Sequence, residues 1–139
     1  MDAVGVPGRT GRDGMGALRQ VQAPDRRGWL IVERDDDDDR ALVARFTGEL
    51  DGPAADLYAA HLRAVIALGP PALAVDLREV TFLCSTGIRL LVMLREWAVR
   101  KGVGWQVSGA STVVDKVLKI AGLEDVRSPV PGPGSRPPH

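Results

Sequence analysis

The sequence predicts an α/β fold, in which a mixed β-sheet with an N-terminal hairpin carries crossover helices packed on it. Two apolar runs, 29–32 and 41–46, flank five aspartates at 35–39, which is typical of two strands joined by a polar turn. A third apolar run at 72–77 is broken only by Asp76, as in a strand covered on both faces. The order strand, strand, helix, strand, helix, strand, helix then requires crossover connections after the hairpin.

The chain of 139 residues is the size of one domain, with 45% hydrophobic residues to build its core. Residues 1–27 are rich in Gly, Arg and Asp and show no repeating apolar face, so we expect a disordered N-terminal tail. Residues 129–139 are rich in Pro and Gly and indicate a second tail. The predicted domain is therefore 28–128.

Three helices are predicted between and after the strands. The first starts at Asp51 and ends before Gly69, and the second covers 85–100. The third is capped by Ser111 and stopped by Gly122, and 126–130 is a candidate edge strand. Periodicity assigns these side chains to the buried faces: Tyr58, Leu62, Val65 and Ile66; Leu90, Leu91, Leu94, Trp97 and Ala98; Val113, Val114, Val117, Leu118 and Ala121.

Charge and composition exclude several classes of partner. The 18 basic and 18 acidic residues balance, so neither a nucleic acid nor an anionic membrane surface is expected as a partner. The single cysteine, Cys84, cannot form an internal disulfide, and the chain has no long uncharged apolar run. We expect a cytoplasmic protein with no direct membrane insertion.

Catalytic and metal-binding patterns are missing from the sequence. The two histidines, His61 and His139, cannot form a relay or a metal cluster, and there is no glycine-rich phosphate loop. The aspartate run is better explained as a solvated turn than as a metal site. We therefore expect no enzyme activity, no cofactor and no metal.

The informative segment is 75–88, VDLREVTFLCSTGI, a buried strand that leads through a short turn into a helix. It resembles the signature of STAS domains of the anti-sigma factor antagonist type, in which V-D-L precedes a hydrophobic pair and then D-S-[ST]-G-[LI]. The segments VDL, FL and STGI match that pattern, and FTGELD at 46–51 is similar to the family's G-x-L-D after the second strand. The resemblance covers about a hundred residues in the same order of elements.

The resemblance implies a function in partner switching. In the family, the first serine of the motif accepts phosphate from a kinase that is also the anti-sigma factor, and that position corresponds to Ser85. A phosphatase is a further expected partner. The contact residues implied here are Thr47, Gly48, Glu49, Leu50, Asp51, Cys84, Ser85, Thr86, Gly87, Ile88, Arg89 and Val92.

Two residues of the motif leave alternatives open. Ser85 could be a phosphoacceptor, since a phosphate is favoured by the free amides and dipole at a helix start, or it could only cap the helix. Cys84 stands where the family has aspartate, which bears on recognition by a kinase. We interpret Cys84 as a small apolar residue that fills the space beneath the turn, rather than as a redox centre.

The outer side of the second predicted helix is a further candidate for partner contact. Ile88 and Val92 fall beside a polar stripe that includes Arg89, which suggests an interface, although scattered exposed apolar residues are common.

Two other functions compete with the antagonist. Stand-alone STAS domains also serve as accessory subunits of lipid-exporting ABC transporters, which need no aspartate before the serine. A STAS domain can also be a ligand-sensing or purely structural module.

Overall fold

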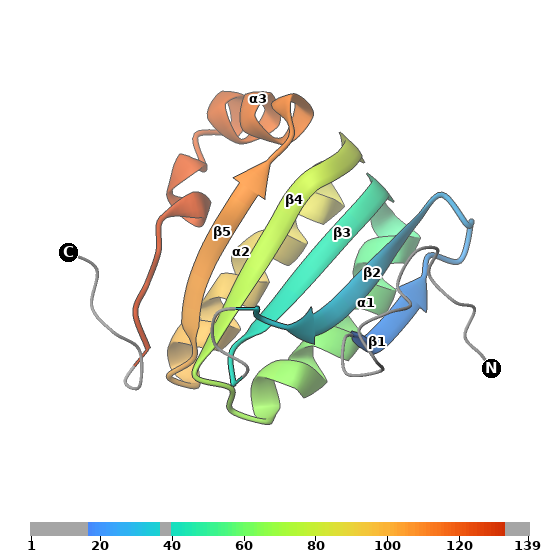
Figure 1. The fold of residues 1–139 in the computed structure, drawn as a ribbon. Helices are drawn as coiled ribbons and strands as arrows, with labels where there is room; N and C mark the ends of the chain where they lie inside the picture. The colour runs from blue at the N-terminus through green and yellow to red at the C-terminus, as the bar shows by residue number, and fades with distance from the viewer. Residues whose placement is uncertain (1–16, 37–39, 133–139) are drawn as a thin grey trace.

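Five strands form one sheet in the computed structural model, which describes residues 17–36 and 40–132 (Figure 1). The strands lie in chain order across the sheet: β1 (Ala17–Gln22), β2 (Gly28–Arg34), β3 (Leu42–Leu50), β4 (Ala72–Leu83) and β5 (Gly104–Ala110). Pairing is antiparallel from β1 to β3 and parallel from β3 to β5. The predicted α/β class, with its hairpin and mixed sheet, is confirmed.

Helices make the connections that the parallel strands require. The helix α1 (Gly52–Ala67) joins β3 to β4, and α2 (Ser85–Arg100) joins β4 to β5. Both lie behind the sheet in Figure 1, whereas α3 (Thr112–Ala121) lies near the upper end of β5 and leads to the short 3₁₀ helix η1 (Glu124–Arg127). Of the helices that the structure describes, α1 and α2 thus cover one face of the sheet, and none lies across the other face.

The core lies between the sheet and the pair α1 and α2. Alternate strand residues point into it, among them Leu30, Phe46 and Leu77, each at most 1% exposed. Tyr58 of α1 packs edge-on against the ring of Phe46, with ring centroids 5.6 Å apart. The buried face predicted for α1 is confirmed.

The buried face of α2 is as predicted except at Trp97, which is half-buried. The guanidinium of Arg63, on α1, lies 4.9 Å from the centre of the Trp97 ring. This cation–π contact explains the position of Trp97 at the outer seam between the two helices.

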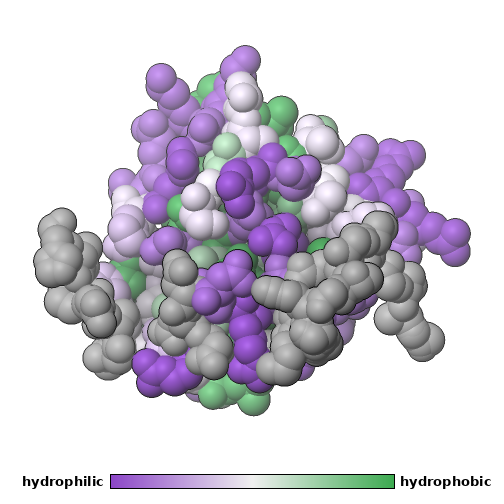
Figure 2. Space-filling model, in the orientation of Figure 1, coloured by the Kyte–Doolittle hydropathy of each residue, from purple (hydrophilic) through white to green (hydrophobic). Residues whose placement is uncertain are grey.

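The uncovered face of the sheet carries polar side chains, and hydrophilic residues occupy much of it in Figure 2. Asp76 of β4 is 2% exposed there and binds Arg78 at 2.9 Å and Arg45 of β3 at 3.2 Å. Arg45 also reaches Glu33 of β2 at 2.5 Å, so the ion pairs cross three strands. Burial by itself would raise the pKa of Asp76, but hydrogen bonds from Arg78 and Arg45 lower it to about 2.

The N-terminal boundary of the domain differs from the prediction. Residues 17–22, assigned above to a disordered tail, form β1 and pair with β2 from Ala17↔Glu33 to Gln22↔Trp29. Val21 is buried, and so is Ala23 in the turn that follows. The strand covers the edge of β2 and the side chain of Leu30, which explains why so short a segment is ordered.

The C-terminal segment also differs. Residues 126–130 do not form a strand, because η1 occupies 124–127 and only Val130 bridges to Trp105. The indole of Trp105 donates a hydrogen bond to the carbonyl of Val126 at 2.8 Å. Gly132 is buried beside the backbone of Gly104, so residues 129–132 belong to the folded part rather than to a tail.

The third helix buries a narrower stripe than its sequence predicts. Val114 and Leu118 are buried and Val117 is half-buried, but Val113 and Ala121 are exposed. The reason is that α3 lies at the end of the sheet rather than across it. Its predicted ends are confirmed: the Ser111 hydroxyl accepts from the amide of Val114, and Gly122 has φ +72°.

Two further expectations concern the turn after β2 and the membrane. Asp36 is exposed, as a solvated turn requires, while 37–39 lie outside the described residues. Among the helices that the structure describes, none combines the length and the apolar character needed to cross a bilayer.

Candidate functional site

The two segments that carry the motif meet where β3 and β4 end. Leu50 is the register partner of Leu83, and the Cys84 amide donates to the Leu50 carbonyl at 3.5 Å. The thiol of Cys84 donates to the same carbonyl, with 3.6 Å between sulfur and oxygen. Because parallel neighbours end at one edge of a sheet, the segments 47–51 and 84–89 are brought together as expected.

Ser85 is the first residue of α2 and is exposed. The residue at the N-cap is Cys84, with extended backbone, and its side chain makes no capping hydrogen bond. The alternative in which Ser85 only caps the helix is therefore wrong. Ser85 is instead an exposed residue of the first turn, where backbone amides lack partners within the helix.

Two of the predicted contact residues are buried and cannot present a side chain to a partner. Leu50 is 1% exposed and belongs to the core. Gly87 lies so close to β3 that an added Cβ would fall 2.6 Å from the Leu50 carbonyl oxygen and 2.7 Å from Leu83 Cδ1. Both positions need small or apolar groups for packing, which also explains why the motif carries them.

The other predicted residues of β3 lie farther back along the strand. Thr47 is paired with Trp29 of β2 and Glu79 of β4, three residues before the strand ends. Gly48 has φ +87° and lies against the Arg27 carbonyl, so its role is to admit the turn between β1 and β2. Only Glu49 and Asp51 of this segment combine partial exposure with charge.

On α2, Arg89 is exposed one turn after Ser85. Thr86, Ile88 and Val92 are half-buried. Ile88 and Val92 also pack against the core, so these two side chains are less available to a partner than the sequence suggests. Glu49 pairs with Arg27 of the β1–β2 turn at 3.6 Å. We call the other remaining candidate residues, Asp51, Cys84, Ser85, Thr86 and Arg89, the Ser85 surface.

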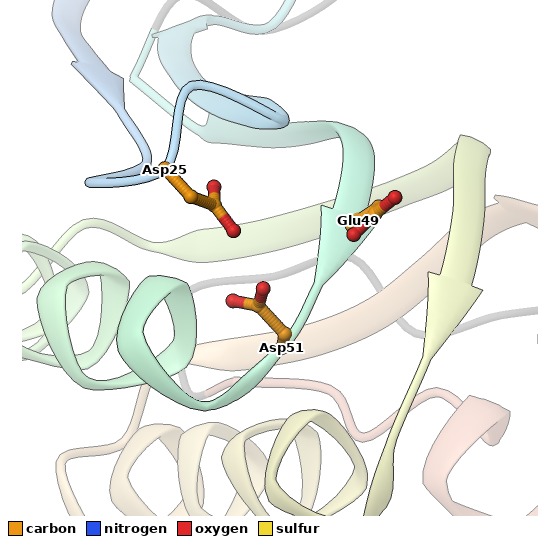
Figure 3. Close-up of side chains that lie close together, drawn as sticks. All are labelled: Asp25, Glu49 and Asp51. Atoms are coloured by element: carbon orange, nitrogen blue, oxygen red, sulfur yellow. The ribbon is translucent and has the colours of Figure 1, made fainter.

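The sequence did not predict an acidic group that shares Asp51 with this surface (Figure 3). Asp25, in the turn after β1, lies with Glu49 and Asp51, and one oxygen of each carboxylate lies within 4.8 Å of the others. Burial, followed by the neighbouring carboxylates, raises the pKa of Asp51, whereas a hydrogen bond from the Arg27 amide lowers the pKa of Asp25. Asp25 lies in the segment that the sequence predicts to be a tail, so its position in the sequence gives no signal of this contact.

A comparison with protein families matches residues 31–130 to the STAS domain. The chain belongs to the STAS domain family. Among solved structures, an anti-sigma factor antagonist from Mycobacterium paratuberculosis is 28% identical, with a TM-score of 0.64 over 78% of this chain and 88% of that chain.

Two structures of SpoIIAA share the STAS fold at lower identity. The anti-sigma factor antagonist SpoIIAA in its unphosphorylated form is 23% identical, with a TM-score of 0.56 over 63% of this chain and 76% of that chain. The Bacillus cell fate determinant SpoIIAA in the phosphorylated form is 20% identical, with a TM-score of 0.57 over 70% and 87%. A comparison with curated proteins gives no match.

Proposed function

We propose that this STAS domain is an anti-sigma factor antagonist, which binds a kinase-type anti-sigma factor through the Ser85 surface and is released when Ser85 is phosphorylated. The role is binding rather than catalysis, with a phosphatase to reverse the modification. An anti-sigma partner would place the protein in the cytoplasm. The name of the 28% identical neighbour, an anti-sigma factor antagonist, supports the choice of partner.

The observation that carries the proposal is the exposed position of Ser85 at the start of α2. The first turn of α2 contains no acidic residue, and Arg89 follows one turn later. A phosphate of about two negative charges would meet free amides, the positive end of the helix dipole and a guanidinium. The modified protein would stay folded, while its contact surface would become negatively charged.

Intact-mass measurement tests the phosphorylation. The chain is incubated with ATP and each kinase-type anti-sigma factor of the host, beside Ser85→Ala and Thr86→Ala. We expect one phosphate on wild type and on Thr86→Ala and none on Ser85→Ala. A phosphate that persists on Ser85→Ala, or wild type left unmodified by every kinase, would contradict the switch.

A second candidate function is favoured by one residue, Cys84. Accessory STAS subunits of lipid-exporting ABC transporters need no aspartate before the serine, and this chain has none there. Co-purification with an ABC transporter, together with no phosphate from any kinase in the experiment above, would support this candidate.

A further inference from the structure

A hydrogen bond between an arginine and a histidine joins β1 to α1. Nη1 of Arg19, in β1, lies 3.2 Å from Nδ1 of His61, in α1, and the contact is partly buried. An arginine side chain donates hydrogen bonds but has no acceptor, so Nδ1 of His61 must be the acceptor. The imidazole in this bond is therefore neutral and carries its proton on Nε2. A histidine that is protonated on both nitrogens could not make the bond.

The bond connects the edge of the sheet to the helices that cover it. β1 is the first strand in the order of the sheet and pairs with β2. Arg19 lies opposite Val32 of β2, whose side chain is in the core, and it shares a face of β1 with the buried Val21. The bond to His61 thus supports a strand that has little apolar surface of its own to bury.

The other charged groups of α1 do not favour a proton on His61. Arg63 lies on another side of the helix, over a tryptophan ring of α2, and Asp56 is exposed more than one turn earlier. Tyr58, one turn before His61, is buried, and burial raises its pKa further above neutral pH. Around neutral pH it therefore adds no charge beside the ring.

The neighbouring strands present cations to this side of α1. Arg19 is the charged partner from β1, and on β2 the charged residue of the core-facing side is Arg34. Glu33 of β2 lies on the opposite face, where it pairs with Arg45. Within the described residues of β1, β2 and α1, a proton on His61 would therefore meet positive charge rather than a carboxylate.

Protonation of His61 is linked to the docking of β1. Burial lowers the pKa of His61, and the charge of Arg19 lowers it further. Because a histidine outside the fold titrates at about pH 6.5, the docked strand favours the neutral ring. The stabilisation that the bond gives is complete above about pH 6.5 and is lost as the pH falls below that value toward the lowered pKa.

We propose that Arg19 and His61 form an acid-sensitive clasp, which holds β1 against α1 while His61 is neutral and weakens when His61 is protonated. The strand would then separate more often from β2 and α1, while the rest of the sheet stays folded. Each separation exposes the edge of β2, whose backbone groups can pair with another strand. The clasp does not depend on the function proposed for Ser85, because neither residue belongs to the Ser85 surface.

Hydrogen exchange of the full chain measures the separation. The protection factors of β1 amides, divided by those of β4 amides in the same sample, report the local opening of β1 at each pH. We expect this ratio to fall several-fold between about pH 7.5 and about pH 5.5 in wild type. His61→Gln should show no such fall, because its amide oxygen can accept from Arg19 and does not titrate. His139→Gln, which replaces the other histidine, should behave as wild type does.

Titration of the His61 ring by NMR is a second measurement, which does not need a variant to keep β1 in place. We expect the pKa of His61 to be lower in the folded chain than in the same chain unfolded in urea. The pKa should rise in Arg19→Met, which removes both the charge and the donor. An equal pKa in the folded and unfolded chains, an unchanged pKa in Arg19→Met, or the same pH dependence of β1 protection in wild type and His61→Gln would each overturn the proposal.

Discussion

Cys84 shows how one residue sets the start of a helix. It occupies the N-cap of α2 and makes no capping bond, while Asp51 and Ser111 cap α1 and α3 through their side-chain oxygens. The thiol instead contacts the Leu50 carbonyl. The sequence predicts a space-filling role for Cys84, and the residue is half-buried. The aspartate that the family has at this position would add the missing capping hydrogen bond.

Cys84→Asp should therefore stabilise the protein. A carboxylate at this position can accept a hydrogen bond from the first turn and faces the positive end of the helix dipole, together worth about 1 kcal/mol. The melting temperature should rise by about 3–6 °C for a domain of this size. Cys84→Ala, which cannot cap, is the control. An unchanged or lower melting temperature in Cys84→Asp would show that the turn has no room for the carboxylate.

Asp76 ties the stability of the sheet to pH. The pKa of its carboxyl in the folded protein is lowered to about 2, so its stabilising effect is complete above pH 4 and is lost as the pH falls through 2. Arg78 is largely exposed, so solvent screens the pair and the contribution is about 1–2 kcal/mol.

Asp76→Asn should destabilise the protein by that amount at pH 7 and flatten the fall in stability between pH 4 and 2. Urea unfolding at several pH values measures this, with Asp56→Asn, an exposed residue of α1, as the control. Equal slopes for Asp76→Asn and wild type in that window would refute the assignment.

At the scale of elements, the contact between α2 and the end of β3 depends on a glycine. An added methyl at Gly87 would overlap the Leu50 carbonyl, whereas one at Gly52, the first residue of α1, would lie 3.9 Å from Thr86 Oγ1. Gly87→Ala should therefore cost about 1–3 kcal/mol, and Gly52→Ala should be close to neutral. Chemical denaturation compares the two. Similar stabilities would mean that α2 can move away from β3 without loss.

The sequence predicted the elements with strong periodicity and missed those that depend on tertiary neighbours. The hairpin of β2 and β3, the buried run of β4 and the amphipathic α1 all carry local signals. The buried apolar residue that marks β1 is Val21, which is too weak a pattern to predict a strand. The segment is a strand because it pairs with β2. In α3, the apolar face that periodicity predicts is wider than the part of the helix that packs against the sheet. Val130, which bridges to Trp105, likewise lies in a segment rich in Pro and Gly, whose pattern does not predict the contact.

The contribution of β1 can be measured by truncation. A chain that starts at Pro24 exposes the edge of β2 and loses the burial of Val21 and Ala23, compared with one that starts at Ala17. We expect the shorter chain to lose at least about 2 kcal/mol of unfolding free energy in urea. Equal stability of the two chains would mean that residues 17–23 do not stabilise the fold, as the sequence predicted for a disordered tail.

At the scale of the whole molecule, the fold brings two helix starts to the same edge of the sheet. The start of α1 adjoins the acidic group and the start of α2 presents Ser85, and both connect to a sheet held by one core. The motif predicted that residues 47–51 and 84–89 meet, because parallel strands end together. It did not predict which of them are buried, since that depends on the close approach of Gly87 and Leu50. A charge added at Ser85 would change the contact surface without changing the core.

The most direct test is the affinity of the host's kinase-type anti-sigma factor for the unmodified chain and for two Ser85 variants. Ser85→Ala should bind within about twofold of wild type, because it leaves the surface neutral, while Ser85→Asp should bind roughly tenfold more weakly or worse. Leu68→Asp adds the same charge at the opposite edge of the sheet, at an exposed residue where α1 ends, and should bind as wild type does. If Ser85→Asp binds as tightly as wild type, or if Leu68→Asp weakens binding as much, then Ser85 does not lie at the partner surface and the proposed switch is wrong.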